Sequence, residues 1–154
     1  MRVIIAAAGT GGHINPGIAI ANKIKKEEPD SEIIFVGTDR GLENDLVPKA
    51  GYGLKTIDAY GLSKEISLAN LKKMIKTIKG INEAKKIVRE FKPDIVIGMG
   101  GYICGAVVLA AKKNHIPVLL HESNSYPGKA VQMLAKKADT VLVSFEDAEK
   151  RIKN

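Results

Sequence analysis

Residues 2–16 read RVIIAAAGTGGHINP, an apolar run followed directly by a glycine-rich turn. The apolar, largely β-branched run at 2–8 predicts a buried strand, and Pro16 suits the first turn of a helix. Between them lie three glycines, which let the backbone approach a bound group closely. This order predicts a phosphate or diphosphate site, because a helix N-terminus offers free N–H groups and the positive end of its dipole.

The rest of the chain repeats this alternation of apolar strands and longer helical patterns. Most of the strands are apolar on both faces, as expected when helices cover both sides of a sheet. We predict strands at 2–8, 32–38, 54–59, 94–99, 117–122 and 140–145. We predict helices at 16–28, 42–50, 68–91 with a break at Gly80, 103–114, 128–136 and 145–153. The pattern indicates one α/β domain with a mainly parallel, Rossmann-like sheet, whose ligands lie at the carboxyl ends of the strands.

The composition favours a cytoplasmic protein with an anionic partner. The 154 residues include 24 Lys and Arg against 17 Asp and Glu, a net charge of +7. The longest apolar runs are about six residues, whereas roughly 18 to 20 are needed to span a bilayer. The single cysteine, Cys104, permits no internal disulfide and is expected to be a small buried residue. Aromatic residues make up only 5% of the chain, so we expect no nucleic-acid partner that binds by base stacking.

The first glycine-rich turn is the first candidate site. Thr10, Gly11 and Gly12 bring backbone N–H groups to a phosphate, and His13 adjoins them. An uncharged imidazole there can accept a proton at physiological pH, whereas a histidine that only caps backbone groups is the alternative. Ile14 stands where a dinucleotide fingerprint has its last Gly or Ala, which disfavours a nicotinamide enzyme.

A second turn follows the fourth predicted strand. Gly100 and Gly101 again allow backbone to touch a ligand, and Tyr102 adds an aromatic face and a hydroxyl. Tyr102 packed beneath a neighbouring loop is the structural alternative.

Four polar side chains end the fifth predicted strand, where the sheet is otherwise apolar. They are His121, Glu122, Ser123 and Asn124. Alternation along a strand directs Glu122 and Asn124 to one side and the other two to the opposite side. Glu122 is then available to orient a sugar hydroxyl or a base, unless the cluster is only a structural network.

A basic amphipathic stretch lies between residues 66 and 91. Apolar side chains recur there at helical spacing with lysines around them, and the candidate membrane contacts are Lys72, Lys73, Ile75, Lys76 and Lys79. The ordinary interpretation is a helix packed on the sheet with its lysines in solvent. The alternative is a surface resting on anionic lipid, where each lysine contributes about 1 kcal/mol.

Taken together, the motifs resemble the N-terminal half of the MurG family, the bacterial N-acetylglucosaminyltransferases of peptidoglycan synthesis. The matching segments are GTGGHINP at 9–16, GT at 37–38, GLE at 41–43, LVP at 46–48, GY at 51–52, GMGGY at 98–102 and HESN at 121–124. The resemblance runs along nearly the whole chain. It implies that residues 1–154 form the N-terminal, acceptor-binding lobe of a GT-B fold, with a C-terminal donor-binding lobe supplied in cis or in trans.

The resemblance also implies an activity. GlcNAc passes with inversion from UDP-GlcNAc to the C4 hydroxyl of MurNAc in undecaprenyl-diphosphate-MurNAc-pentapeptide, without a cofactor or metal, at the inner face of the plasma membrane. His13 matches the family's proposed base or diphosphate contact, and Asn124 matches a donor-sugar contact. The turn at 10–12 matches the donor-contacting loop, and Glu122 and Tyr102 match residues implicated in acceptor handling. We therefore expect His13 and Glu122 to be the catalytic residues.

Two other functions stay open at this point. One is a non-catalytic, membrane-recruiting lobe of a two-chain GlcNAc transferase. The other is a nucleotide-cofactor oxidoreductase, which Ile14 disfavours.

Overall fold

The structure is a computed structural model that describes the backbone at 1–60 and 68–152, and the side-chain surroundings at 1–60 and 77–152. In these residues six strands form one sheet in the order β3-β2-β1-β4-β5-β6, and every neighbouring pair is parallel. The strands are β1 Arg2–Ala6, β2 Glu32–Gly37, β3 Gly53–Thr56, β4 Ile95–Gly98, β5 Val118–Glu122 and β6 Thr140–Val143. The predicted α/β class and parallel sheet are confirmed.

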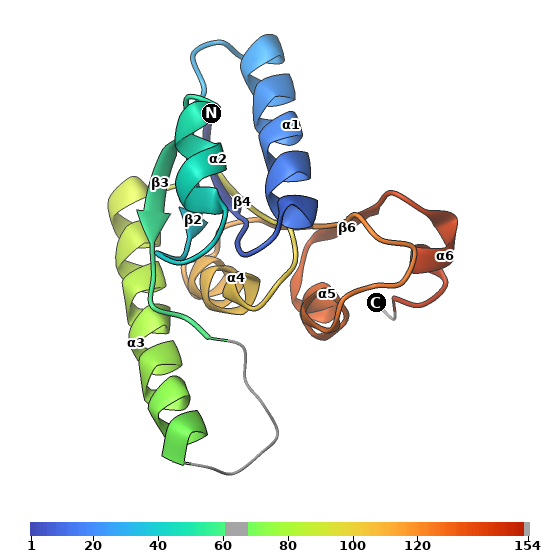
Figure 1. The fold of residues 1–154 in the computed structure, drawn as a ribbon. Coiled ribbons are helices and arrows are strands. Elements are labelled where there is room, and N and C mark those ends of the chain that lie inside the picture. The colour runs from blue at the N-terminus through green and yellow to red at the C-terminus, as the bar shows by residue number, and fades with distance from the viewer. Residues whose placement is uncertain (61–67, 153–154) are drawn as a thin grey trace.

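Helices cover both faces of this sheet. They are α1 Gly11–Glu27, α2 Glu43–Lys49, α3 Leu68–Phe91, α4 Ile103–Lys113, α5 Lys129–Leu134 and α6 Glu146–Glu149, with a 3₁₀ turn at Ala135–Lys137. Figure 1 shows α2 on one side of β3 and α3 on the other, with α3 extending past the arrowhead of β3. The carboxyl ends of the strands therefore face the end of the molecule toward which α3 projects.

Strand β1 explains why both faces are apolar. Val3 and Ile5 belong to a buried cluster with residues of α1 and α2, whereas Ile4 and Ala6 belong to a cluster with residues of α3 and α4. Because side chains alternate along a strand, a central strand needs apolar residues at every position to serve both cores.

The helix predicted at 145–153 is shorter in the structure, where α6 spans Glu146–Glu149. Two other predicted helix features are wrong. Helix α1 begins at Gly11 instead of residue 16, so Pro16 lies inside the helix. Proline lacks the N–H that would bond to the carbonyl of Gly12, and Gly12 is exposed, so water can satisfy that carbonyl. The earlier start places His13 in the first helical turn instead of a loop.

Helix α3 also runs without the predicted break at Gly80. A Cβ at Gly80 would lie 2.5 Å from the carbonyl oxygen of Asp58, in the segment after β3. The glycine therefore lets the helix approach that backbone closely, and it does not end the helix.

Candidate functional site

The site lies beside β1 and β4, the two neighbouring strands at which the strand order of the sheet reverses direction. β1 pairs with both β2 and β4, and the chain continues from β1 toward β2 and from β4 toward β5. In an open parallel sheet this point leaves a crevice at the carboxyl ends of the strands. The turns after β1 and β4 meet there, so two of the predicted glycine-rich turns belong to one site.

His13 is the side chain that joins these two turns. Gly100 and Gly101 have φ angles of +93° and +78°, a conformation that side chains disfavour. A Cβ at Gly100 would lie 3.1 Å from Nε2 of His13, and one at Gly101 would lie 3.6 Å from Nδ1. The second turn therefore needs glycine both for its backbone and for the close approach of the imidazole.

The imidazole of His13 has unused hydrogen-bonding capacity. Its Nδ1 atom is buried and has no hydrogen-bond partner among the described residues. Buried polar atoms are normally hydrogen-bonded. An unpaired ring nitrogen between the turns after β1 and β4 therefore indicates a place for a ligand group.

The first turn of α1 supplies backbone donors beside this histidine. Thr10 is the N-cap residue in an extended conformation, and its hydroxyl makes no capping hydrogen bond. The N–H groups of His13 and Ile14 both donate to the carbonyl of Thr10. The first N–H groups of a helix have no acceptor within it, so those of Gly11 and Gly12 are available to an anion.

Glu43 also helps to form the site, although in the sequence it stands out only as part of the GLE motif at 41–43. It is fully buried at the start of α2. One carboxylate oxygen accepts the Gly9 N–H at 2.9 Å, and the other accepts the N–H and hydroxyl of Thr38 at 2.8 and 2.7 Å. Burial opposes ionisation, but the hydrogen bonds from Gly9 and Thr38 outweigh it and lower the pKa of Glu43. An ionised carboxylate thus ties the turn after β1 to the turn after β2.

Glu122, at the end of β5, is a second buried carboxylate that accepts several hydrogen bonds. One oxygen accepts the backbone N–H and side-chain amide of Asn124 at 2.9 and 2.8 Å, and the other accepts the Gly128 N–H at 2.8 Å. Glu122 and Asn124 thus lie on one side, as alternation predicts. Both oxygens of Glu122 are engaged within the chain, so its carboxylate shapes the segment leading into α5.

His121 lies on the other side of the same strand end, also as predicted. Its ring nitrogens lie 3.5 Å from the hydroxyls of Ser123 and Ser144. Burial disfavours the imidazolium and lowers the pKa of His121, although the charge of Glu122 opposes this.

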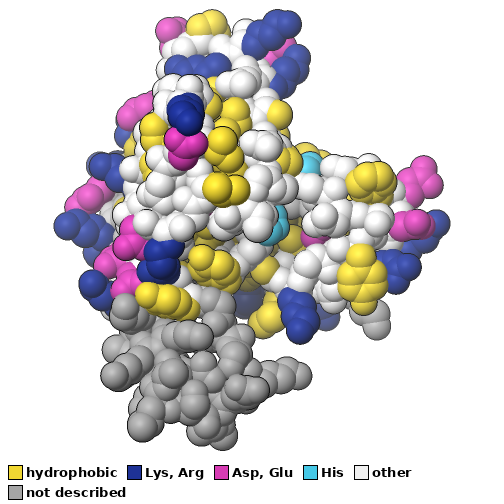
Figure 2. All heavy atoms as spheres, viewed as in Figure 1, with side chains coloured by type: hydrophobic (Ala, Val, Ile, Leu, Met, Phe, Trp, Pro, Cys, Tyr) yellow, Lys and Arg dark blue, Asp and Glu magenta, His cyan; other side chains and the backbone are white. Residues whose placement is uncertain are grey.

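Tyr102 and Cys104 differ sharply in exposure. Tyr102 is 41% exposed at the N-cap of α4, so it is not packed under a neighbouring loop. Cys104 is fully buried, its thiol donates to the carbonyl of Gly100 at 2.9 Å, and burial raises its pKa to about 12. The thiol is therefore a packing group, as the sequence predicts. On the face of the molecule that Figure 2 shows, histidine side chains lie near the centre with hydrophobic side chains around them.

The predicted membrane residues fall mostly outside what can be described. The side chains of Lys72, Lys73, Ile75 and Lys76 lie outside the described residues. Lys79 is exposed and lies 3.5 Å from the carboxylate of Glu83. Within the described residues, every helix is too short or too polar to span a bilayer.

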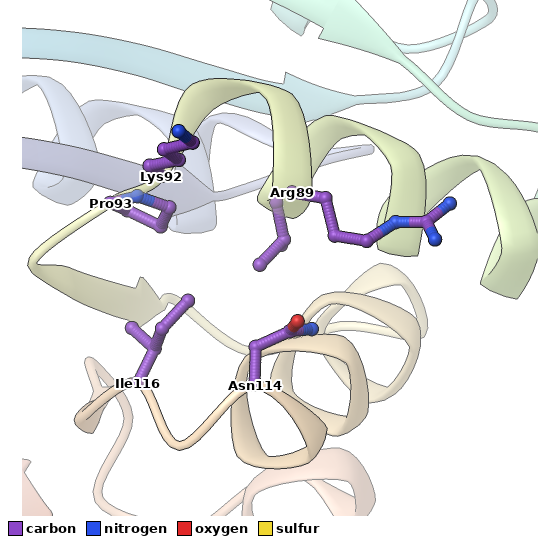
Figure 3. A pocket seen from close by; sticks show the side chains of 6 residues that line it. Arg89, Lys92, Pro93, Asn114 and Ile116 are labelled. Atoms are coloured by element: carbon purple, nitrogen blue, oxygen red, sulfur yellow. The ribbon is translucent and has the colours of Figure 1, made fainter.

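A separate pocket lies at the opposite, amino-terminal edge of the sheet. It measures about 360 Å³ and is lined by Val88, Arg89, Lys92, Pro93, Asn114 and Ile116. Figure 3 shows the side chain of Arg89 extending along α3, away from Lys92. The two cations do not converge on one point, so this pocket is not the candidate site.

Among the residues whose side chains are described, no group of three or more His, Cys, Asp and Glu is arranged to hold a metal ion. The expected independence from cofactors and metals stays a prediction.

Comparison with known proteins identifies similar chains. Residues 3–143 match the Glycosyltransferase family 28 N-terminal domain. A UDP-N-acetylglucosamine--N-acetylmuramyl-(pentapeptide) pyrophosphoryl-undecaprenol N-acetylglucosamine transferase of Clostridioides difficile (strain 630) is 50% identical over 151 residues, which are 98% of this chain and 37% of the relative. The protein of the same name from Alkaliphilus oremlandii is 50% identical over 154 residues, 100% of this chain and 42% of the relative.

Solved structures agree with these relatives. The crystal structure of Acinetobacter baumannii MurG superimposes with a TM-score of 0.80 at 28% identity, over 95% of this chain and 42% of that one. A UDP-N-acetylglucosamine 2-epimerase, at 19% identity and a TM-score of 0.67, shares the fold alone. The chain thus spans about two fifths of the length of the relatives it matches.

Proposed function

The chain belongs to the family of glycosyltransferase family 28 N-terminal domains, and we propose that it is the acceptor-binding lobe of an inverting N-acetylglucosaminyltransferase. The proposed reaction moves GlcNAc from UDP-GlcNAc to the C4 hydroxyl of MurNAc in undecaprenyl-diphosphate-MurNAc-pentapeptide. The names of the relatives support this substrate pair. The observation that carries the proposal is the imidazole of His13, set beside free helix N–H groups with an unpaired Nδ1.

In this reaction His13 removes the proton from the C4 hydroxyl as its oxygen attacks the anomeric carbon of GlcNAc. The bond from that carbon to UDP breaks, UDP leaves with the bonding electrons, and one displacement inverts the anomeric centre. A positioned general base contributes typically 10²- to 10⁴-fold. The first turn of α1 supports the same step, because the N–H groups of Gly11 and Gly12 and the helix dipole stabilise a diphosphate.

The other predicted residues act around this centre. Exposed Asn124 has an amide oxygen that no described donor uses, which supports a contact to the donor sugar. Exposed Tyr102 offers its ring and hydroxyl to the acceptor. Because both carboxylate oxygens of Glu122 accept hydrogen bonds from its own turn, we assign it a positioning role toward Asn124 in place of the expected catalytic role.

The proposal extends to partners and place. A C-terminal lobe, in cis or in trans, holds most of UDP-GlcNAc, and no cofactor takes part. The basic stretch that includes Lys79 rests on anionic lipid at the cytoplasmic face of the plasma membrane. Sedimentation with anionic vesicles at low salt checks this contact, and absence of binding there contradicts it.

The test of the proposed function uses the natural full-length protein that carries these residues. His13→Ala is expected to lower turnover of UDP-GlcNAc and the lipid-linked acceptor by about 10²-fold or more. His115→Asn is the matched control, because His115 is an exposed histidine with φ +56° at the start of the segment between α4 and β5, where asparagine is tolerated. Turnover of His13→Ala equal to that of the control removes His13 from the mechanism. Absence of GlcNAc transfer by the unmutated protein, assayed together with its C-terminal lobe, contradicts the function itself.

A further inference from the structure

We propose that Glu43 is a positioning residue for the proposed reaction, one that fixes the anion-binding turn of residues 9–12. This inference rests on the proposed function. Glu43 lies outside the residues that the activity uses directly, and it is among the largest side chains that are fully buried. A carboxylate is costly to bury unless hydrogen bonds and charge compensate for lost water, so its retention at this place calls for a role.

The first support is the pattern of its hydrogen bonds. The two oxygens of Glu43 bind different turns, with Gly9 on one side and Thr38 on the other, and the partners are 34 and 5 positions away in the sequence. β1 and β2 are paired strands, so the carboxylate bridges the carboxyl ends of two neighbouring strands. The turn after β1 is thereby held to the turn after β2, its neighbour in the sheet.

The second support is the space made for this side chain. A Cβ at Gly41 would overlap the carboxylate of Glu43, and a Cβ at Gly37 would lie 2.6 Å from its Cγ. Neither glycine has a positive φ. Both are therefore explained by the path of the Glu43 side chain and not by backbone conformation.

Glu43 determines which N–H groups of the turn remain for a ligand. Glu43 takes the N–H of Gly9, whose φ of +89° turns the chain toward α1. The N–H groups left for an anion are those that follow at residues 10–12, and Gly11 and Gly12 lie in the same helical turn as His13. Glu43 thus sets where a diphosphate sits relative to the imidazole.

Glu43→Gln tests the hydrogen bonds of Glu43 separately from the volume of its side chain. Glu43→Gln keeps the volume, but its amide nitrogen cannot accept a hydrogen bond, so either Gly9 or Thr38 loses its acceptor. A displacement of about 1 Å can cost 10²-fold in rate. We expect kcat/KM in the full-length protein to fall at least 10-fold, with a raised KM for UDP-GlcNAc, because the turn that Glu43 positions is the one proposed to contact the donor diphosphate. A merely structural role would lower the folded fraction and apparent kcat but leave KM unchanged.

Glu83→Gln is the matched control. Glu83 also accepts a backbone N–H at this edge of the sheet, from Asp58 at 2.7 Å, but it lies on α3 away from the glycine-rich turn. Its substitution is expected to change kcat/KM less than twofold. If the unmutated protein transfers GlcNAc and Glu43→Gln matches this control, the positioning role is wrong although the proposed function stands.

A second readout does not depend on activity. In ¹H–¹⁵N NMR spectra, Glu43→Gln is expected to shift the amide signals of Gly11 and Gly12, and Glu83→Gln is expected to leave them in place. Unshifted Gly11 and Gly12 signals in Glu43→Gln overturn the inference even if the protein proves to have another activity. Absence of GlcNAc transfer by the unmutated protein together with shifted signals overturns the proposed reaction but keeps Glu43 as the residue that positions the turn.

Discussion

Two buried glutamates, Glu43 and Glu122, serve the same edge of the sheet in different ways. Each accepts three hydrogen bonds through both carboxylate oxygens. Glu43 joins turns that belong to different strands, reaching Gly9 across 34 positions of sequence. Glu122 closes the turn that directly follows its own strand, with partners 2 and 6 positions away.

Glu43 therefore positions two turns relative to each other, whereas Glu122 stabilises the conformation of a single turn. A contact between near neighbours forms as soon as its own segment folds, because little chain entropy opposes it. A contact between distant segments forms only when the paired strands bring the turns together. Loss of Glu43 should therefore disturb the relation between two turns, whereas loss of Glu122 should disturb one.

The largest expected effect comes from removing each carboxylate. Glu43→Ala leaves the N–H of Gly9 and two donors of buried Thr38 without acceptors. At about 1–3 kcal/mol for an unsatisfied buried group, we expect a loss of about 3 kcal/mol in unfolding free energy. Glu122→Ala should cost about 1–2 kcal/mol, because its partners Asn124 and Gly128 are exposed and can bind water. Urea unfolding measures both, and an equal or larger loss for Glu122→Ala contradicts the comparison.

A smaller effect is expected from glycines beside the two carboxylates. A methyl group at Gly41 would overlap the carboxylate of Glu43, so Gly41→Ala should cost about 2 kcal/mol through overpacking. A Cβ at Gly128 would lie 3.8 Å from Oε2 of Glu122, an ordinary contact. Gly128→Ala should cost less than about 1 kcal/mol, the effect of alanine at an N-cap. Thermal unfolding of the two variants compares them directly, and similar losses would mean that the space around Glu43 is not constrained.

Acid should weaken the Glu43 contact in a predictable direction. The pKa of Glu43 in the folded protein is lowered, because the hydrogen bonds from Gly9 and Thr38 outweigh the cost of burial. Its stabilisation is therefore fully present above the unfolded carboxyl pKa, about 4.3, and is lost as the pH falls through the lowered folded value. Between about pH 6 and pH 3, the unmutated chain should lose more unfolding free energy than Glu43→Gln. Parallel pH profiles would show that Glu43 does not titrate in this way.

The smallest effect is expected at His121, beside Glu122. Burial lowers the pKa of this imidazole in the folded protein, with partial opposition from Glu122. The related stabilisation is present above the unfolded histidine pKa, about 6.5, and is lost as the pH falls through the folded value. Chemical unfolding at about pH 7.5 and 5.5 should show a smaller decrease for His121→Asn than for the unmutated chain. A larger decrease for the variant would reverse the assigned direction.

Much of the fold could be predicted because central strands and helices leave strong local patterns. Apolar runs such as 2–8 indicated strands buried on both faces, and their parallel pairing followed from the intervening helices. The helix boundaries were less accessible. The start of α1 depended on whether Pro16 could lie inside a helix, and the continuity of α3 depended on a contact between Gly80 and Asp58, far away in the sequence.

Some residues of the candidate site could likewise be predicted from the sequence, and others could not. Residues that are unusual in their own segment, such as His13 and Glu122, were visible as polar or glycine-rich interruptions of apolar strands. Glu43 was not, because a glutamate at the start of an amphipathic helix looks like an ordinary surface residue. Its burial depends on Gly9 and Thr38 from other strands, and only GLE at 41–43 within the family motif drew attention to it.

Amide hydrogen exchange tests the division between the two glutamates most directly. The account predicts that Glu43→Gln speeds exchange at Gly9 or at Thr38, whichever faces the amide nitrogen, while Asn124 and Gly128 stay as in the unmutated chain. Glu122→Gln should give the reverse pattern. Unchanged protection of Gly9 and Thr38 in Glu43→Gln, or loss of protection at both sets in either variant, would contradict it.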